Sequence, residues 1–273
     1  MNYEINRPPM AVILAADAGA QLGPLTDSSA TCMLHVGGTV ILERMIRNCL
    51  SCGISQFVLV LGPRADEIRQ VLNKTFRGIR ITYVINTRYR ETDTAYALML
   101  AASAVGTAAF VTFDADLVFE VKILRQLVDM ELPNVLCVTR DLSLAEGALQ
   151  VLVDEDMHVI DVARAIDPKL ALGRAVGIEK ISARTGPLVF AELALMMENP
   201  GNLKAPNEAA YARLVDKGTV VDVLDITGLQ WTAIKSTEDL GTANRMFQSP
   251  ITTVSRGQQR ALDEDAKKDT HPT

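Results

Sequence analysis

The sequence predicts an α/β fold with a doubly wound, mainly parallel sheet and helices on both of its faces. Short, continuous apolar runs at 11–16, 56–61, 79–85 and 107–113 have the length expected of strands that are buried on both faces. Segments with helical spacing of apolar residues separate these runs, as in right-handed crossovers. With 273 residues, 48% of them hydrophobic, the chain can bury the core of one such domain with an elaborated second half.

The connections between the runs complete this prediction. A loop of more than twenty residues follows the first run and leads to a helix over 40–52, for which Gly53 is a typical C-terminal stop. Further helices are expected over 64–74, to about 104 and over 121–130, with a fifth strand over 134–140. The second half is expected to add a β-hairpin over 148–162, helices over 183–198 and 207–216, and a strand over 219–225.

Charge and hydropathy exclude two classes of partner. The formal net charge of −6 and the isoelectric point near 5.2 argue against a nucleic-acid footprint, which needs a basic face. No apolar run approaches the roughly 18 residues needed to cross a bilayer. The N-terminus also lacks a basic start followed by an apolar segment. We therefore expect a cytoplasmic protein with neither a nucleic-acid nor a membrane partner.

The cysteines and histidines do not form a pattern typical of a metal site. Cys49 and Cys52 form a C-x-x-C pair, but no second ligand pair accompanies it, and it lies at the end of a predicted amphipathic helix. Besides the redox or metal interpretation, these thiols can pack as small apolar residues, which we favour. His35, His158 and His271 are scattered, so a zinc site or a Ser/His/Asp hydrolase has no support.

The long loop after the first strand carries an ordered set of small residues. In sequence order these are Leu14-Ala15-Ala16, Gly19, Leu22-Gly23-Pro24-Leu25-Thr26 and Val36-Gly37-Gly38. The loop leaves the carboxyl end of a strand, where open α/β sheets bind ligands. This pattern resembles that of nucleotidyltransferases, which join a nucleoside triphosphate to a sugar 1-phosphate or to phosphocholine. The resemblance implies a Rossmann-like fold in which the nucleotide is bound by Leu14, Ala15, Ala16, Asp17, Ala18, Gly19 and Gln21.

The same loop departs from the family's pattern at three places. Asp17 replaces a loop glycine, Gln21 replaces the arginine that grips a phosphate, and Ala30-Thr31-Cys32 replaces a P-K-P segment with its lysine. In the family a phosphate oxygen attacks the α-phosphorus of the triphosphate and pyrophosphate leaves, with help from positioning and charge neutralisation. A loop without Arg or Lys, and with an added carboxylate, is expected to neutralise a triphosphate poorly.

A second block, residues 86–98, resembles the N-x-x-Y-x-x-T-N-N-x-Y-S-L segment of phosphocholine-type members. The matching residues are Asn86, Tyr89, Thr92, Tyr96 and Leu98. The resemblance implies that Thr92 and Tyr96 approach the nucleotide, although Asp93 and Thr94 replace the asparagine pair. The alternative is that Thr92 is only a helix N-cap, with Tyr96 packing one turn later.

Two aspartates, Asp114 and Asp116, follow the fourth predicted strand. The family has an N-G-D triplet here, and its last aspartate holds Mg²⁺ against the α-phosphate. Asp116 matches that aspartate, and Asp114 takes the preceding polar position beside the nucleotide. Carboxylates at the end of a strand suit Mg²⁺, which takes one or two protein oxygens together with phosphate and water. The alternative is that both acids cap the helix that begins near Val121.

The second half carries two more blocks with exchanged residues. The resemblance implies acceptor binding by Arg164, near a lysine often seen there, and by Arg174, which replaces the glutamate of a G-E-x-x-G-I segment. Residues 231–240 resemble W-x-E-I-D-T-x-E-D-L, with Lys235 in place of the aspartate that is the second metal ligand. An ammonium group there disfavours a divalent cation, so Mg²⁺ is a doubtful cofactor. Asp116 and Lys235 are the candidate catalytic residues.

The resemblance also divides the chain. Residues 1–9 form an N-terminal arm, residues 10–140 a nucleotide-binding half, and residues 141–248 an acceptor half of one nucleotidyltransferase-like domain. Residues 249–273 contain few apolar side chains, which predicts a mobile tail.

Three functions remain open from the residues. The first is a nucleotidyltransferase whose activity is reduced or lost, with Asp116 as the surviving metal ligand. The second is a pseudoenzyme, a nucleotide or nucleotide-sugar binding protein or regulatory partner, in which Lys235 pairs with Asp116 or contacts a phosphate. The third is a shifted chemistry in which Lys235, Arg164 or Arg174 supplies the missing charge. The expected partners are a nucleoside triphosphate or nucleotide-sugar, a small phosphorylated acceptor, and a further copy of the chain or a partner protein.

Overall fold

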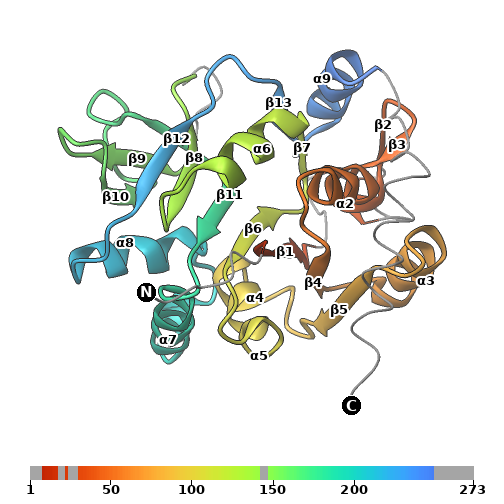
Figure 1. The fold of residues 1–273 in the computed structure, drawn as a ribbon, viewed down its shortest axis with the longest axis horizontal. Helices are drawn as coiled ribbons and strands as arrows, with labels where there is room; N and C mark the ends of the chain where they lie inside the picture. Colours follow the sequence, from red (N-terminus) through yellow and green to blue (C-terminus); the bar gives the residue numbers. More distant parts are fainter. Residues whose placement is uncertain (1–7, 18–21, 24–29, 142–146, 249–273) are drawn as a thin grey trace.

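A nine-stranded sheet forms the centre of the protein, which the computed structural model describes over residues 8–17, 22–23, 30–141 and 147–248 (Figure 1). Its strands are β1 (Met10–Ala15), β4 (Gln56–Leu61), β5 (Arg80–Ile85), β6 (Phe110–Asp114), β8 (Val135–Thr139), β9 (Gln150–Val153), β10 (Val159–Ala163), β11 (Gly173–Ile181) and β12 (Asp222–Asp225). Their order is β10-β9-β11-β6-β1-β4-β5, and β8 pairs with both β11 and β12.

The two halves of the sheet differ in strand direction. β1 lies parallel to both β4 and β6, and β4 lies parallel to β5. Beyond β6 the sheet continues through β11, which is antiparallel to β6, β8 and β9. The hairpin of β9 and β10 closes that side. The predicted α/β class, with a doubly wound sheet and a hairpin in the second half, is therefore confirmed.

Helices cover both faces of the sheet (Figure 1). They are α2 (Ile41–Ser51), α3 (Ala65–Thr75), α4 (Thr94–Leu100), α5 (Ala102–Val105), α6 (Val121–Asp129), α7 (Gly186–Met197), α8 (Glu208–Asp216) and α9 (Thr237–Met246). Alternate residues of β1 serve two cores: Ile13 packs in the core with α2, α3 and α6, and Val12 in the core with α4, α7 and α8. A strand buried on both faces must be apolar throughout, which is why its sequence signal is continuous.

Two short ribbons lie outside the sheet. They are β2 (His35–Val36) with β3 (Thr39–Val40), and β7 (Leu117–Phe119) with β13 (Trp231–Ala233). Gly37 joins β2 to β3 with φ +56°, and a Cβ there would lie 1.7 Å from the carbonyl oxygen of Phe247, which follows α9. Only glycine therefore lets the end of α9 lie against this turn, where the Gly37 amide donates to Asn244 Oδ1 at 3.0 Å.

Some boundaries differ from the sequence prediction. The strand predicted from residue 107 begins at Phe110, because Gly106 turns the chain with φ +61° and Ala108 N donates to Val105 O. The helix predicted to about 104 divides into α4 and α5. The predicted tail lies outside the described residues, as does most of the predicted arm. In the described ranges, no helix is both long enough and apolar enough to cross a membrane.

Candidate functional site

The carboxyl ends of β1 and β6 bring several predicted site residues together. The two strands are parallel and in register, with Leu14 opposite Asp114, so the residues after them meet at the same edge of the sheet. Ala16 and Asp17 follow β1, and Asp116 follows β6. The predicted residues Ala18, Gly19 and Gln21 lie outside the described residues.

The ribbon of β7 and β13 brings Lys235 to this edge. Ala233 pairs with Leu117, and Ile234 N donates to the carbonyl oxygen of Asp116 at 2.9 Å. Lys235 is the next residue, and its ammonium group lowers the pKa of Asp116. Two segments more than a hundred residues apart in the sequence thus meet where the motifs predict.

Asp114 is a half-buried residue whose carboxyl group requires a glycine beside it. A Cβ on Gly177, which has φ +85°, would lie 2.6 Å from Asp114 Oδ2, so a larger residue there would displace the carboxyl group. Burial raises the pKa of Asp114 well above its usual range, and the charges of Glu208 and Asp116 raise it further.

Asp116 has an unusual protonation equilibrium for an aspartate. Burial raises its pKa to about 6, an effect that Lys235 opposes and Asp17 reinforces. Neither Asp114 nor Asp116 caps helix α6, because its N-cap is Glu120, which makes no side-chain cap, and β7 lies between. The helix-cap alternative for the two aspartates is therefore wrong.

Asp93 and Glu208 form a second wall of the site, which the sequence did not predict. They lie at the N-termini of α4 and α8. Asn207 N, just before α8, donates to Thr94 Oγ1 at the start of α4 (3.0 Å). Asp93 N also donates to Leu203 O, in the segment that leads to α8. Glu208 is only 4% exposed. Burial raises its pKa, Arg164 lowers it and Asp93 raises it. In sequence, an acid in the first turn of a helix is ordinary, so no signal distinguished it.

A buried network continues inward from Glu208. Glu179 on β11 accepts hydrogen bonds from Thr112 Oγ1 on β6 and from Asn207 Nδ2 at 3.5 Å. Burial raises the pKa of Glu179 well above its usual range, with Glu208 and Asp114 adding to the effect. Below we call Asp93, Asp114, Asp116, Glu179 and Glu208 the carboxylate cluster.

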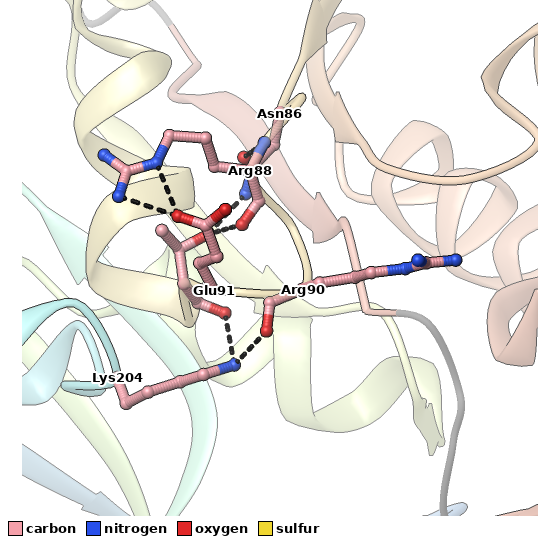
Figure 2. A network of polar contacts seen from close by, with 6 residues as sticks. Asn86, Arg88, Arg90, Glu91 and Lys204 are labelled. Atoms are coloured by element: carbon pink, nitrogen blue, oxygen red, sulfur yellow. Dashed lines mark hydrogen bonds and ion pairs between the residues drawn. The ribbon is translucent and has the colours of Figure 1, made fainter.

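The loop 86–93 forms the third side of the site. Thr92, which was predicted to approach the nucleotide, forms hydrogen bonds within the loop instead. The Thr92 hydroxyl donates to Arg88 O (2.9 Å) and accepts from Asn86 Nδ2 (3.0 Å), so it holds the loop together. Figure 2 shows the labelled partners of this network. The N-cap of α4 is Asp93, which accepts from Thr94 N, so the N-cap alternative for Thr92 is wrong by one residue. The guanidinium of Arg88 lies 5.5 Å from the ring centroid of Tyr96.

The two predicted acceptor-side arginines have different surroundings. Arg164 interacts with both Glu208 and Asp93, lowering the pKa of each. Arg174 stacks on Trp231, with its guanidinium 4.9 Å from the ring centroid, and donates to Asp141 O at 3.2 Å. Burial lowers the pKa of Arg174. Arg164 therefore lies with the carboxylate cluster, whereas Arg174 interacts with Trp231 and Asp141.

The donor set around Asp116 fits Mg²⁺ poorly. Mg²⁺ binds carboxylate oxygens, but the charge that acts most strongly on Asp116 is the ammonium group of Lys235. Two cations at one carboxylate repel each other. Over the ranges that the structure describes, no group of three or more His, Cys, Asp or Glu side chains is arranged to hold a metal ion.

Part of the chain is similar in sequence to known nucleotidyltransferases. Residues 10–134 match the family model described as nucleotidyl transferase. The chain is 26% identical over 265 residues, 94% of its length, to a CMP-5'-(3-aminopropyl)phosphonate synthase of Streptomyces rubellomurinus, covering 41% of that protein. It is 26% identical over 108 residues, 40% of its length, to a 2-aminoethylphosphonate cytidylyltransferase of Lancefieldella rimae, covering 43% of it. The chain thus spans less than half the length of these relatives.

The fold is also similar to that of a known nucleotidyltransferase. The inositol-1-phosphate CTP transferase of T. maritima superposes with a TM-score of 0.71 at 21% identity, over 97% of this chain and 99% of the other. The chain is therefore similar to nucleotidyltransferases, in sequence over residues 10–134 and in fold over most of its length. Cytidylyltransferases and sugar-phosphate nucleotidyltransferases are among its relatives.

Proposed function

We propose that this protein binds a nucleoside triphosphate, preferably CTP, at the carboxyl edge of β1 and β6, and transfers its nucleotidyl group slowly to a small phosphate or phosphonate. An oxygen of the acceptor attacks the α-phosphorus, the bond from that phosphorus to the bridging oxygen breaks, and pyrophosphate leaves. The observation that carries the proposal is the meeting of Asp114, Asp116 and Lys235 at the edge where the β1 loop begins.

The acceptor that we propose carries an amine. Asp93 and Glu208 each raise the electrostatic cost of a further anion, and Arg164 is a cation that interacts with both. An acceptor with both a phosphorus-bearing anion and an ammonium group could contact Arg164 and the two acids at once. Two relatives are named for aminoalkyl phosphonates. Phosphocholine has the same combination of charges, and a sugar 1-phosphate lacks the ammonium group.

The low rate follows from the exchanged residues. Lys235 adds a positive charge beside Asp116 where the family pattern has a carboxylate, and the loop lacks the Arg and Lys of that pattern at Gln21 and Thr31. The loss of one transition-state charge contact costs about 3 kcal/mol. After several such losses, the main contribution of the protein to the rate of transfer is to hold the two substrates in a reactive orientation.

A product-formation assay tests this function. CTP, UTP, ATP and dTTP are each incubated with 2-aminoethylphosphonate, phosphocholine and glucose 1-phosphate, with and without Mg²⁺, and pyrophosphate and the nucleotide product are quantified. We expect slow product formation with CTP and the amine-bearing acceptors, and none with the Asp116→Asn variant. If no combination gives a product, the transfer is excluded.

A second candidate function is nucleotide binding without transfer. It is favoured by the ammonium group of Lys235 beside Asp116, because a lysine can contact a phosphate directly where a metal ion would otherwise bridge. Calorimetric titration with CTP, with and without Mg²⁺, distinguishes the two. Binding of similar strength in both conditions supports the lysine contact, and tight binding that requires Mg²⁺ contradicts it.

A further inference from the structure

The backbone of the loop between β5 and α4 is held by several hydrogen bonds, and the side chain of Arg90 in this loop forms none of them. Arg88 N donates to Asn86 Oδ1 at 2.9 Å, and Thr92 Oγ1 links Asn86 to Arg88 O. From outside the loop, Lys204 Nζ donates to Arg90 O at 2.9 Å and to Thr92 O at 3.3 Å. The backbone on both sides of residue 90 is therefore fixed.

Of the three cations at this loop, Arg88 and Lys204 use their charged groups in contacts within the protein. Arg88 forms an ion pair with Glu91 at 2.9 Å, and Lys204 is bound to the two carbonyl oxygens. Arg90 differs, because none of the ion pairs between described residues includes it. Figure 2 shows its side chain extended away from Arg88, Glu91 and Lys204, on the far side of the loop.

Arg90 is nevertheless held in one direction. Its guanidinium lies 5.7 Å from the ring centroid of Tyr89. That ring packs against the core formed with α4, α7 and α8, so it is a fixed platform. A guanidinium that lies over a ring face uses none of its N–H donors in that contact, so they stay available to an anion. A locked backbone and a fixed ring together lower the entropy lost when Arg90 binds.

The loop lies at the edge of the sheet where the nucleotide site is proposed. Asn86 N donates to Leu61 O, the last residue of β4, which is the neighbour of β1. Asp93 lies three residues after Arg90. Burial raises the pKa of Asp93, and the charge of Asp17, which follows β1, raises it further. The loop and the end of β1 are therefore within electrostatic range of each other. A triphosphate bound there needs a cation to offset these carboxylates.

We propose that Arg90 binds the phosphate chain of the nucleoside triphosphate. It supplies, from the loop after β5, positive charge that the loop after β1 lacks at Gln21 and Thr31. The inference rests on the proposed nucleotide site and adds to it a residue that the sequence motifs did not indicate. A charge-assisted hydrogen bond from a guanidinium to a phosphate is among the stronger polar contacts in proteins.

The experiment is calorimetric titration of the full chain and of Arg90→Ala with CTP, CMP and cytidine. We expect Arg90→Ala to weaken CTP at least 10-fold, CMP less, and cytidine not at all, because only the phosphates lose a contact. Arg69→Ala is the matched control: Arg69 also stacks on a tyrosine, 5.3 Å from the ring centroid of Tyr83, but it lies on α3 and is paired with Asp66. The Arg69→Ala variant should bind CTP, CMP and cytidine as tightly as the wild type does.

The outcomes separate the two proposals. If the wild type binds CTP and Arg90→Ala binds it equally well, the role of Arg90 is overturned and the nucleotide site stands. If Arg90→Ala weakens cytidine as much as CTP, the residue supports the loop rather than the phosphates, which also overturns it. If the wild type binds none of the three ligands, both the site and the role of Arg90 are overturned.

Discussion

Two glutamates on neighbouring helices have the same small exposed fraction, and yet their pKa values are shifted in opposite directions. Glu192 on α7 and Glu208 on α8 are each 4% exposed. Burial acts to raise the pKa of Glu192, but hydrogen bonds from Lys217 and Arg213 outweigh it and leave the pKa lowered. Burial raises the pKa of Glu208, and the more distant charge of Arg164 does not offset it.

The difference distinguishes a carboxylate that is paired within the fold from those of the proposed site. Glu192 has two cations in contact, Arg213 Nη1 at 3.2 Å and Lys217 Nζ, which tie α7 to α8 and its following turn. The carboxylate cluster instead combines several acids with few contacting cations, which costs folding free energy and is typical of sites that wait for a ligand.

The largest effect is expected from Lys235→Asp, which turns the cluster toward the family pattern. A carboxylate at this position removes the cation beside Asp116 and supplies a second oxygen ligand. We expect Mg²⁺-dependent product formation to rise about 100-fold, the size of one transition-state charge contact. The measurement is the rate of pyrophosphate release against Mg²⁺ concentration.

Lys235→Ala is the control for this change. It removes the ammonium group without adding a ligand, so it should not give the Mg²⁺ dependence. An equal gain in Lys235→Ala and Lys235→Asp would show that relief of positive charge, rather than a new metal ligand, is responsible.

The next effect is expected from Glu192→Gln, which breaks the paired carboxylate. Hydrogen bonds to charged groups contribute about 1.5–3 kcal/mol each when buried, but Arg213 and Lys217 are 47% and 56% exposed, and solvent screening reduces this. We expect unfolding free energy at pH 7 to fall by about 1–2 kcal/mol, as measured by denaturant unfolding. Glu198→Gln, at an exposed residue just after α7, should change it by less than about 0.5 kcal/mol.

The contribution of Glu192 should also depend on pH in a defined direction. Its pKa is lowered in the folded state, so the unfolded chain takes up the proton first, at a pKa of about 4.3. The stabilisation is present above that value and is lost as pH falls through the folded pKa. The stability difference between wild type and Glu192→Gln should be constant above about pH 5.5 and shrink below about pH 4.5. A difference that grew in acid would contradict the pairing.

The contrast between the two glutamates also shows what the sequence could and could not predict. Continuous apolar runs identified β1 and β4 because both of their faces are buried. The sequence could predict that Asp116 and Lys235 lie near each other, because each lies in a short recognisable motif, and the Ile234–Asp116 hydrogen bond joins the two segments. Their role stays a prediction.

Glu179 and Glu208 could not be found in the same way. Glu179 looks like a polar residue on an alternating strand, and Glu208 like an acid that stabilises the first turn of α8. Their raised pKa values come from burial and from each other, and hence from contacts between β6, β11 and α8 that no local pattern encodes. The backbone position of Arg90 likewise depends on Lys204, more than a hundred residues away in the sequence.

The smallest effect is expected from Glu179→Gln, which makes the sharpest contrast with Glu192→Gln. Because burial raises the pKa of Glu179 well above its usual range, the folded protein keeps the proton on this side chain to a higher pH than the unfolded chain, which releases it above about pH 4.3. A group of this kind stabilises the fold fully only below its unfolded pKa, and loses that contribution as pH rises toward the folded value.

Glutamine keeps the shape of Glu179, has the uncharged form that burial favours, and can still accept from Thr112 Oγ1. At pH 7.5 we therefore expect no loss of stability and a gain of at most about 1 kcal/mol, which should vanish near pH 4. Denaturant unfolding at both pH values measures it. A loss as large as that of Glu192→Gln would mean that Glu179 is ionised and paired like Glu192, and the distinction between the two kinds of buried carboxylate would then fail.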